Sequence, residues 1–102
     1  MALFAATAHA NRIPNGKYAC YSSGVFVYER IKIRSASDYT LIPSTGEAKK
    51  GTYHHGSRKS ITWKSGPLKK LATGGKHIKF GNGEDGIKVS FEGGANWECV
   101  VP

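Results

Sequence analysis

The chain has 102 residues, of which 15 are basic and 7 acidic, and its formal net charge is +8. A chain of this length builds one domain around one hydrophobic core. Because 39% of the residues are hydrophobic and 22% are charged, the composition argues against intrinsic disorder. The longest apolar stretch, residues 1–8, is far shorter than the roughly 20 residues of a membrane-spanning helix.

The N-terminus resembles the end of an export signal. Ala8-His9-Ala10 places small residues at the two positions that a signal peptidase reads, although no basic segment precedes them. We interpret residues 1–10 as a signal-peptide remnant and residues 11–102 as a single domain. A frayed N-terminal tail is the alternative. The first interpretation predicts a secreted or periplasmic protein.

Two cysteines, Cys20 and Cys99, lie near the two ends of that domain. Oxidising compartments permit disulfides, and a bridge closing so long a loop would stabilise the fold by roughly 4 to 5 kcal/mol in the chain-entropy model. We therefore predict a Cys20–Cys99 disulfide. Two buried free thiols in a cytosolic protein are the alternative, and no Cys-x-x-Cys motif indicates a redox or zinc site.

Short runs of alternating apolar and polar residues, separated by turn residues, predict β-strands along the whole chain. The predicted strands span residues 17–21, 25–34, 38–42, 51–55, 60–64, 77–80, 87–91 and 96–101. Residues 68–71 form the only plausible helical turn, which the glycines at 74–75 end. The alternation places on the inner face Ile31, Ile33, Ile61, Trp63, Ile78, Phe80, Ile87, Val89, Phe91, Trp97, Cys99 and Val101.

These strands predict an all-β fold, a small antiparallel barrel of seven or eight strands. Parallel pairing would need helical crossovers, for which the chain has too few residues. Closing the sheet removes its exposed edges, and it brings the first and last strands together, where the disulfide would link them. A two-sheet β-sandwich is the alternative fold.

Basic residues are concentrated in the middle of the chain, and no acidic residue lies among them. This uneven distribution predicts a positive face that binds an anionic ligand, namely an acidic glycan, a lipid headgroup or an envelope polymer. Nucleic acid is the least favoured partner because no nucleic-acid-binding motif is present. A solvated basic surface is the alternative. The predicted ligand-binding residues are Lys49, Lys50, Arg58, Lys59, Lys64, Lys69, Lys70, Lys76 and Lys79.

Catalytic and metal-binding patterns are weak. The segment at residues 81–86 has the spacing G-x-G-x-x-G, but two strands flank it, so we predict a hairpin loop rather than a phosphate site. His54 and His55 are adjacent in a predicted strand and point to opposite faces, which prevents joint metal chelation. We predict surface histidines, no metal site, no cofactor and no enzymatic activity.

Gly51-Thr52-Tyr53, followed by Ile61-Thr62-Trp63-Lys64-Ser65-Gly66-Pro67-Leu68, resembles a pattern of small exported bacterial β-barrel proteins without assigned activity. It covers about a fifth of the chain. The resemblance implies a fold but no chemistry.

More distantly, the frame of Tyr18-x-Cys20, Trp63-x-x-Gly66 and Cys99 is similar to the periplasmic inhibitors of c-type lysozyme, which are disulfide-closed barrels. The Ser-Gly-x-x-Tyr inhibitory loop of that family has no counterpart here. This resemblance implies an alternative function, a protein inhibitor of a hydrolase such as lysozyme, acting through the loop at residues 57–60 or 81–86.

Overall fold

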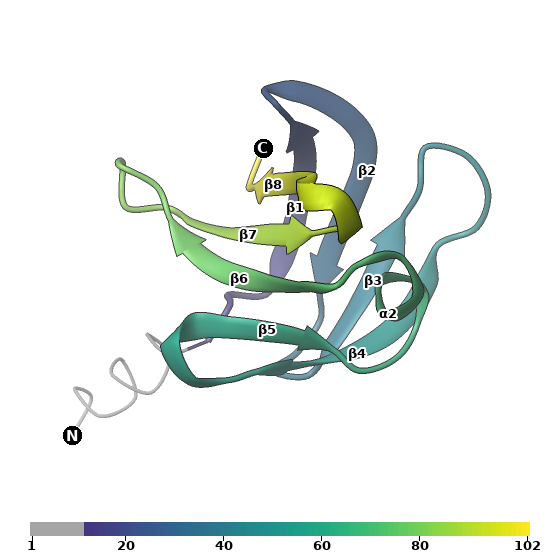
Figure 1. Ribbon diagram of the computed structural model, residues 1–102, viewed down its shortest axis with the longest axis horizontal. Helices are drawn as coiled ribbons and strands as arrows, with labels where there is room; N and C mark the ends of the chain where they lie inside the picture. Colours follow the sequence, from purple (N-terminus) through teal and green to yellow (C-terminus); the bar gives the residue numbers. More distant parts are fainter. Residues whose placement is uncertain (1–11) are drawn as a thin grey trace.

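The computed structural model describes residues 12–102, so the segment interpreted as a signal-peptide remnant lies outside the described residues. Eight strands form a closed antiparallel barrel in which each strand pairs with the next along the chain and β8 returns to β1 (Figure 1). This confirms the predicted all-β barrel, with eight strands. They are β1 (Gly16–Ser22), β2 (Val25–Ile33), β3 (Asp38–Ile42), β4 (Lys49–His55), β5 (Ser60–Trp63), β6 (Gly74–Lys79), β7 (Asp85–Ser90) and β8 (Asn96–Val100).

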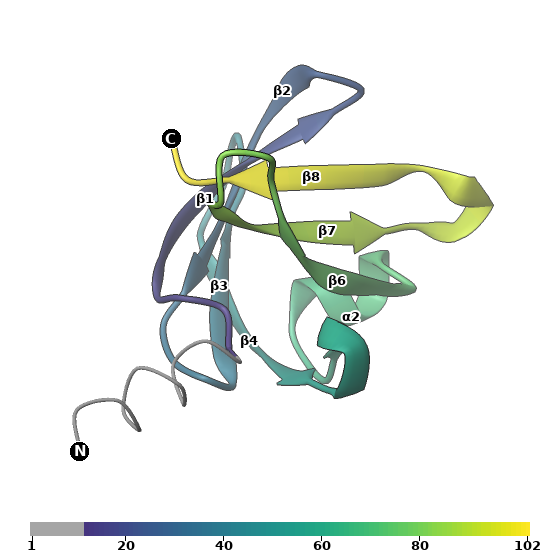
Figure 2. The ribbon, with the colours of Figure 1, turned by 90° about the vertical axis from the view of Figure 1, so that its left-hand side faces the viewer.

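Three short helices interrupt the strand sequence, η1 (Ser57–Lys59), α2 (Pro67–Leu71) and η2 (Glu92–Gly94). The helix α2 contains the predicted helical turn and lies beside β4 (Figure 1). In Figure 2, β7 and β8 cross steeply in front of β3 and β4, as expected for strands on opposite walls of a barrel. Among residues 12–102, no helix has the length and apolar character that crossing a membrane requires.

A disulfide closes the barrel where its first and last strands meet. The β1–β8 ladder contains only three residue pairs, and Cys20 pairs with Cys99 at its centre. The two cysteines form the predicted bridge, their Cα atoms lie 3.9 Å apart, and both are fully buried. The bridge therefore reinforces the shortest ladder that joins β1 to the rest of the sheet.

The barrel interior is apolar, and its buried phenol and indole groups are hydrogen-bonded. The hydroxyl of Tyr18 donates to the Pro14 carbonyl at 2.7 Å, and that of Tyr53 donates to the Ser35 carbonyl at 2.8 Å. The indole of Trp63 donates to the Gly74 carbonyl at 3.0 Å. The largest fully buried side chains are Tyr18, Tyr39, Ile13, Ile31, Ile33, Leu68, Ile87, His77, Val89, Cys20 and Cys99.

The strand β6 differs from its prediction in both position and orientation. It begins at Gly74, three residues before the predicted strand, because the absent side chain of Gly75 makes room for the neighbouring strands. A Cβ there would lie 2.6 Å from the Lys88 carbonyl oxygen and 3.3 Å from the Trp63 ring. The inward residue is His77, 2% exposed, so the prediction that Ile78 and Phe80 face inward is wrong.

The end of β8 also differs slightly. Val101 was expected to face inward, but it follows the strand and is 47% exposed. Phe91 and Trp97 are half-buried and pack against the core, with their ring centroids 4.8 Å apart. The remaining inward predictions are confirmed, because each of those side chains is buried.

Candidate functional site

The two ends of the barrel carry different chemistry. At one end β4 begins, β5 ends and α2 packs on the wall; we term this the groove end and define it by Lys49, Lys50, Pro67, Lys70 and Leu71. At the other end β4 and β6 finish and β7 begins; we term this the histidine end and define it by His55, His77 and Asp85.

Two glycines allow α2 to lie close to β4 at the groove end. A Cβ on Gly51 would lie 2.4 Å from the Ser65 carbonyl oxygen, and a Cβ on Gly66 would lie 2.7 Å from the Lys50 carbonyl oxygen. Gly66 also has a φ of 84°, which favours glycine. Any side chain at either position would therefore push the start of α2 away from the strand.

Hydrogen bonds then hold that connection in place. The Tyr39 hydroxyl donates to the Ser65 carbonyl and accepts from the Leu68 amide, both at 2.9 Å. The Thr52 amide donates to the Ser65 hydroxyl at 3.0 Å. Residues 51–53 and 61–68 thus form the framework that positions α2, with Lys49 and Lys50 just before it and Lys69 and Lys70 just after it.

A groove of about 430 Å³ lies between β4 and α2. Lys49, Lys50 and Lys70 line it together with the apolar side chains of Pro67 and Leu71. No acidic residue lines this groove, and within residues 12–102 none of its lysines forms a salt bridge. It therefore combines three exposed positive charges with an apolar floor.

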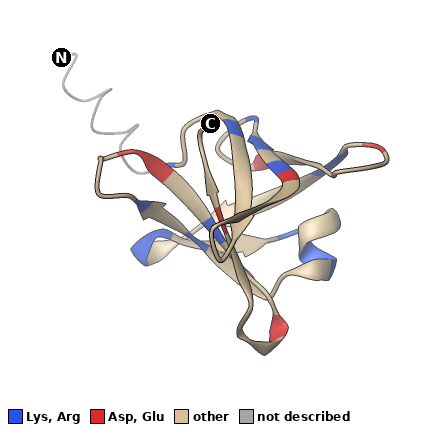
Figure 3. Ribbon diagram, turned by 90° about the horizontal axis from the view of Figure 1, so that it is seen from above, with Lys and Arg blue, Asp and Glu red and all other residues tan. Residues whose placement is uncertain are grey.

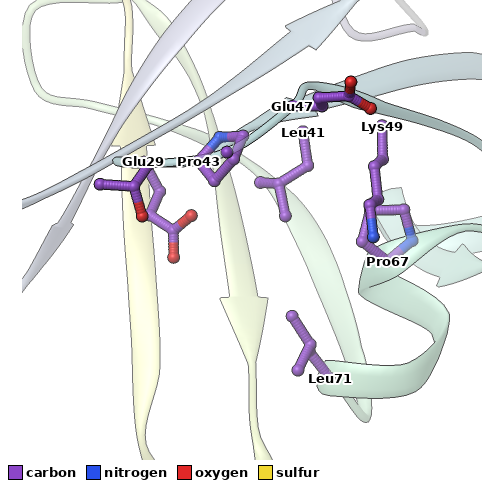
Figure 4. Close-up of a pocket in the computed structure, with 9 residues that line it drawn as sticks. Glu29, Leu41, Pro43, Glu47, Lys49, Pro67 and Leu71 are labelled. Atoms are coloured by element: carbon purple, nitrogen blue, oxygen red, sulfur yellow. The ribbon is translucent and has the colours of Figure 1, made fainter.

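A second pocket of about 320 Å³ adjoins the groove and shares Lys49, Pro67 and Leu71 with it. Figure 4 shows Lys49 close to Pro67, and Glu29 beyond Pro43 and Leu41. Glu47 also lines this pocket. The pair of pockets thus changes from basic near α2 to mixed charge near β2.

The nine predicted basic residues do not all meet. Only Lys49, Lys50 and Lys70 line the groove, and Lys69 lies beside Lys70 on α2. Basic segments lie on several sides of the barrel in Figure 3. The others are placed at the end of β5 (Lys64), on η1 at the far end of the β4–β5 hairpin (Arg58 and Lys59) and on β6 (Lys76 and Lys79).

The sheet also places two lysines from outside the predicted basic segment in line with Lys50. Lys17 pairs with Lys32, Lys32 pairs with Thr40, and Thr40 pairs with Lys50, which makes one row across β1 to β4. Like charges on directly paired residues repel each other. Lys17 and Lys32 lie outside the basic segment of the sequence, and only the strand register connects them to Lys50.

The histidine end holds a chain of three titratable side chains. His55 Nε2 lies 3.1 Å from His77 Nδ1, and His77 Nε2 lies 2.7 Å from the Asp85 carboxylate. Lys79 Nζ lies 3.3 Å from the same carboxylate oxygen. His77 was expected at the surface with the other histidines, and this is wrong because the carboxylate and the second imidazole satisfy both of its ring nitrogens inside the barrel.

Burial and charge shift the proton affinities at this end. Burial lowers the pKa of His55, and the neighbouring His77 and Lys59 lower it further. Burial acts to raise the pKa of Asp85, but hydrogen bonds from His77 and Lys79 outweigh it and leave that pKa below its ordinary value. Burial, followed by the charge of Asp85, raises the pKa of Tyr18 to about 12.

His54 and His55 were expected to point to opposite faces of their strand and so not to bind a metal ion together. His54 is exposed while His55 faces the interior, as their adjacent positions on β4 predicted. Among residues 12–102, no group of three or more histidine, cysteine, aspartate or glutamate side chains has a geometry that could hold a metal ion.

Both loops considered for an inhibitory role are at the surface. Residues 81–84 form the exposed β6–β7 hairpin loop, which the Phe80 amide closes by donating to the Glu84 carbonyl at 2.9 Å. This confirms the predicted hairpin loop. The loop at residues 57–60 contains η1, in which Arg58 and Lys59 have positive φ angles.

No protein-family model matches the chain, and no curated protein or solved structure is significantly similar to it.

Proposed function

We propose that this protein is an exported, non-enzymatic binding module that takes an anionic ligand in the groove between β4 and α2. The observation that carries the proposal is that Lys49, Lys50 and Lys70 line one groove that no acidic residue lines. Positive charges concentrated in a concave site attract an anion more strongly than the same charges on a flat surface. The ligand class is an acidic glycan, a lipid headgroup or an envelope polymer.

The chemistry of the groove favours a ligand with both charge and apolar surface. Lysine ammonium groups act as compact point charges and impose no planar geometry on the anion. Pro67 and Leu71 offer apolar contact beside them, and Leu71 is 57% exposed. A sugar acid or a phosphorylated headgroup with carbon atoms next to its charge fits this combination.

Two further features support export and a binding rather than a catalytic role. A structural disulfide such as Cys20–Cys99 persists mainly in oxidising compartments. Within residues 12–102, the His77–Asp85 pair hydrogen-bonds to another imidazole and to Lys79, and no serine or cysteine nucleophile bonds to it. A histidine acts as general base in covalent catalysis by activating a neighbouring serine or cysteine, and among the described residues this pair has no such neighbour bonded to it.

Two charge-matched triple variants test the proposal. The groove variant is Lys49→Gln, Lys50→Gln, Lys70→Gln, and the control is Lys59→Gln, Lys76→Gln, Lys88→Gln, which removes the same charge away from the groove. Binding is measured by calorimetry against polygalacturonate and against vesicles containing phosphatidylglycerol, at low and high salt.

We expect the groove variant to lose at least about tenfold in affinity for one of these probes, and the control to lose less than about threefold. Wild-type binding should weaken as salt rises. Equal losses in both variants would mean that the net charge of +8 acts alone and would refute a groove site. Binding that is insensitive to salt, or no binding to either probe, would also refute it.

A further inference from the structure

The outer face of the β1–β2 hairpin carries three aromatic rings and one arginine in contact. The ring centroids of Tyr21 and Phe26 lie 5.4 Å apart, and those of Phe26 and Tyr28 lie 4.8 Å apart. The Arg30 guanidinium carbon lies 4.9 Å from the centroid of Phe26. We term these four residues the aromatic face. The hairpin lies at the top of Figures 1 and 2, away from α2.

The tyrosines of this face differ from those inside the barrel. The buried Tyr18, Tyr39 and Tyr53 each donate their hydroxyl to a backbone carbonyl. Tyr21 and Tyr28 form no hydrogen bond of this kind within residues 12–102, and Tyr28 is 64% exposed. Three phenol hydroxyls are therefore bonded within the fold, whereas those of Tyr21 and Tyr28 have no carbonyl acceptor among the described residues.

Tyr28 also occupies a backbone conformation that disfavours it. Ala19 pairs with Arg30 and Tyr21 pairs with Phe26, so three residues of β2 lie opposite the single Cys20. Within this bulge Tyr28 has a φ of 63°, where glycine is favoured and a bulky side chain is rare. Such strain at a residue that is 64% exposed indicates a function for the ring rather than a contribution to folding.

Arg30 completes the face with an uncommitted charge. Within the described part of the chain it forms no salt bridge, and its position over Phe26 restrains the guanidinium. A planar guanidinium binds a carboxylate through two parallel hydrogen bonds. The face therefore combines apolar ring surfaces, two phenol hydroxyls and a guanidinium group that can bind an anion.

We propose that the aromatic face binds a sugar ring that carries a carboxylate, as in a uronic-acid glycan. The C–H face of a pyranose packs on an aromatic ring, its hydroxyls hydrogen-bond to phenols, and its carboxylate pairs with Arg30. A purely apolar partner would leave all three polar groups of the face without hydrogen bonds, which is costly. The inference rests on the proposed function for the anionic class of ligand but uses different residues.

The test titrates tetragalacturonate, and separately the uncharged cellotetraose, into ¹⁵N-labelled protein and follows the amide shifts. The variants are Tyr28→Gly and Arg30→Gln. Their controls are Val25→Ala, an exposed neighbour in the same strand, and Arg34→Gln, which removes the same charge beyond the other end of β2. The groove variant described above is titrated in parallel.

We expect Tyr28→Gly and Arg30→Gln each to weaken tetragalacturonate binding by at least about tenfold, and both controls to stay within about twofold. Tyr28→Gly should keep or raise the thermal midpoint, because its φ suits glycine, so its loss of binding is not a loss of fold. The groove variant should retain the shifts of the aromatic face. These shifts would persist even if the groove itself bound nothing.

Unchanged affinity in both variants, or equal affinity of cellotetraose and tetragalacturonate, would overturn the assignment. A face that binds neither sugar but causes a self-association that Tyr28→Gly abolishes would also overturn it, in favour of a contact between two copies.

Discussion

The groove end and the histidine end both carry charged side chains, but only those of the histidine end are paired with one another. At the groove end, three lysines are exposed and have no acidic partner among the groove-lining residues. At the histidine end, Asp85 receives hydrogen bonds from His77 and Lys79, and His77 also contacts His55. Charged groups that pair with one another stabilise the fold, whereas exposed charged groups without a partner are free to bind a ligand. The contrast indicates which end serves the structure and which serves a ligand.

The largest expected effect comes from removing the covalent link that closes the barrel between β1 and β8. Replacing both cysteines, Cys20→Ser with Cys99→Ser, should lower the free energy of unfolding by roughly 4 to 5 kcal/mol in the chain-entropy model. The bridge spans 79 residues and sits at the centre of the three-pair β1–β8 ladder. Urea denaturation of both proteins under oxidising conditions measures the difference. A loss below about 1 kcal/mol would show that the ladder closes the barrel without the bridge.

An effect of intermediate size is the difference in stability lost when each end of the barrel is mutated. His77→Ala should lower the free energy of unfolding by about 2 to 4 kcal/mol, because it leaves Asp85 and His55 without their buried partner. The groove variant with three glutamines should change it by less than about 1 kcal/mol. Lys76→Ala, exposed on the same strand as His77, is the control for β6. Thermal or urea unfolding of all three decides, and equal destabilisation at the two ends would contradict the assignment of roles.

The smallest effect is a dependence of stability on pH that only the histidine end should produce. The pKa of His55 is lowered in the folded protein, so the unfolded chain binds a proton more readily. Its contribution to stability is therefore complete above the ordinary value of 6.5 and is lost as pH falls through the folded pKa. The lowered pKa of Asp85 adds a second loss, which begins below its ordinary value of 3.8.

Unfolding free energies measured from pH 8 to pH 3 should show both losses in the wild type. His55→Gln should remove the first loss and keep the second. His54→Gln, its exposed neighbour, should leave the profile as it is. A first loss that survives in His55→Gln would place its origin elsewhere in the molecule.

Much of the fold followed from local pattern. Ile31 and Ile33 in β2, and Ile61 and Trp63 in β5, face inward as their alternation predicted, because period-two alternation carries the orientation of a half-buried strand. The strand β6 is the exception. A strand through residues 76–78 can face either His77 or Ile78 inward. Hydrophobicity favoured Ile78, but His77 is the buried residue. Hydrogen bonds from His77 to Asp85 on β7 and to His55 on β4 make the buried histidine the stable choice.

The candidate sites were less accessible from sequence for the same reason. The basic segment contained the three groove lysines, but nothing in the sequence distinguished them from Arg58 or Lys76. The placement of α2 by Gly51 and Gly66 made that distinction. Phe26, Tyr28 and Arg30 were visible in one predicted strand, but the direction in which their side chains point was left open, since the bulge depends on how β1 and β2 register.

The amino-acid sequence alone determined the all-β class, the antiparallel pairing, the Cys20–Cys99 bridge and most strand orientations, because these depend on residues next to each other or on a single possible pair. Tertiary structure alone decided which lysines share a groove, which histidine is buried and which aromatic rings meet outside the barrel. Those outcomes depend on contacts between distant strands, and the closure and register of the barrel set them.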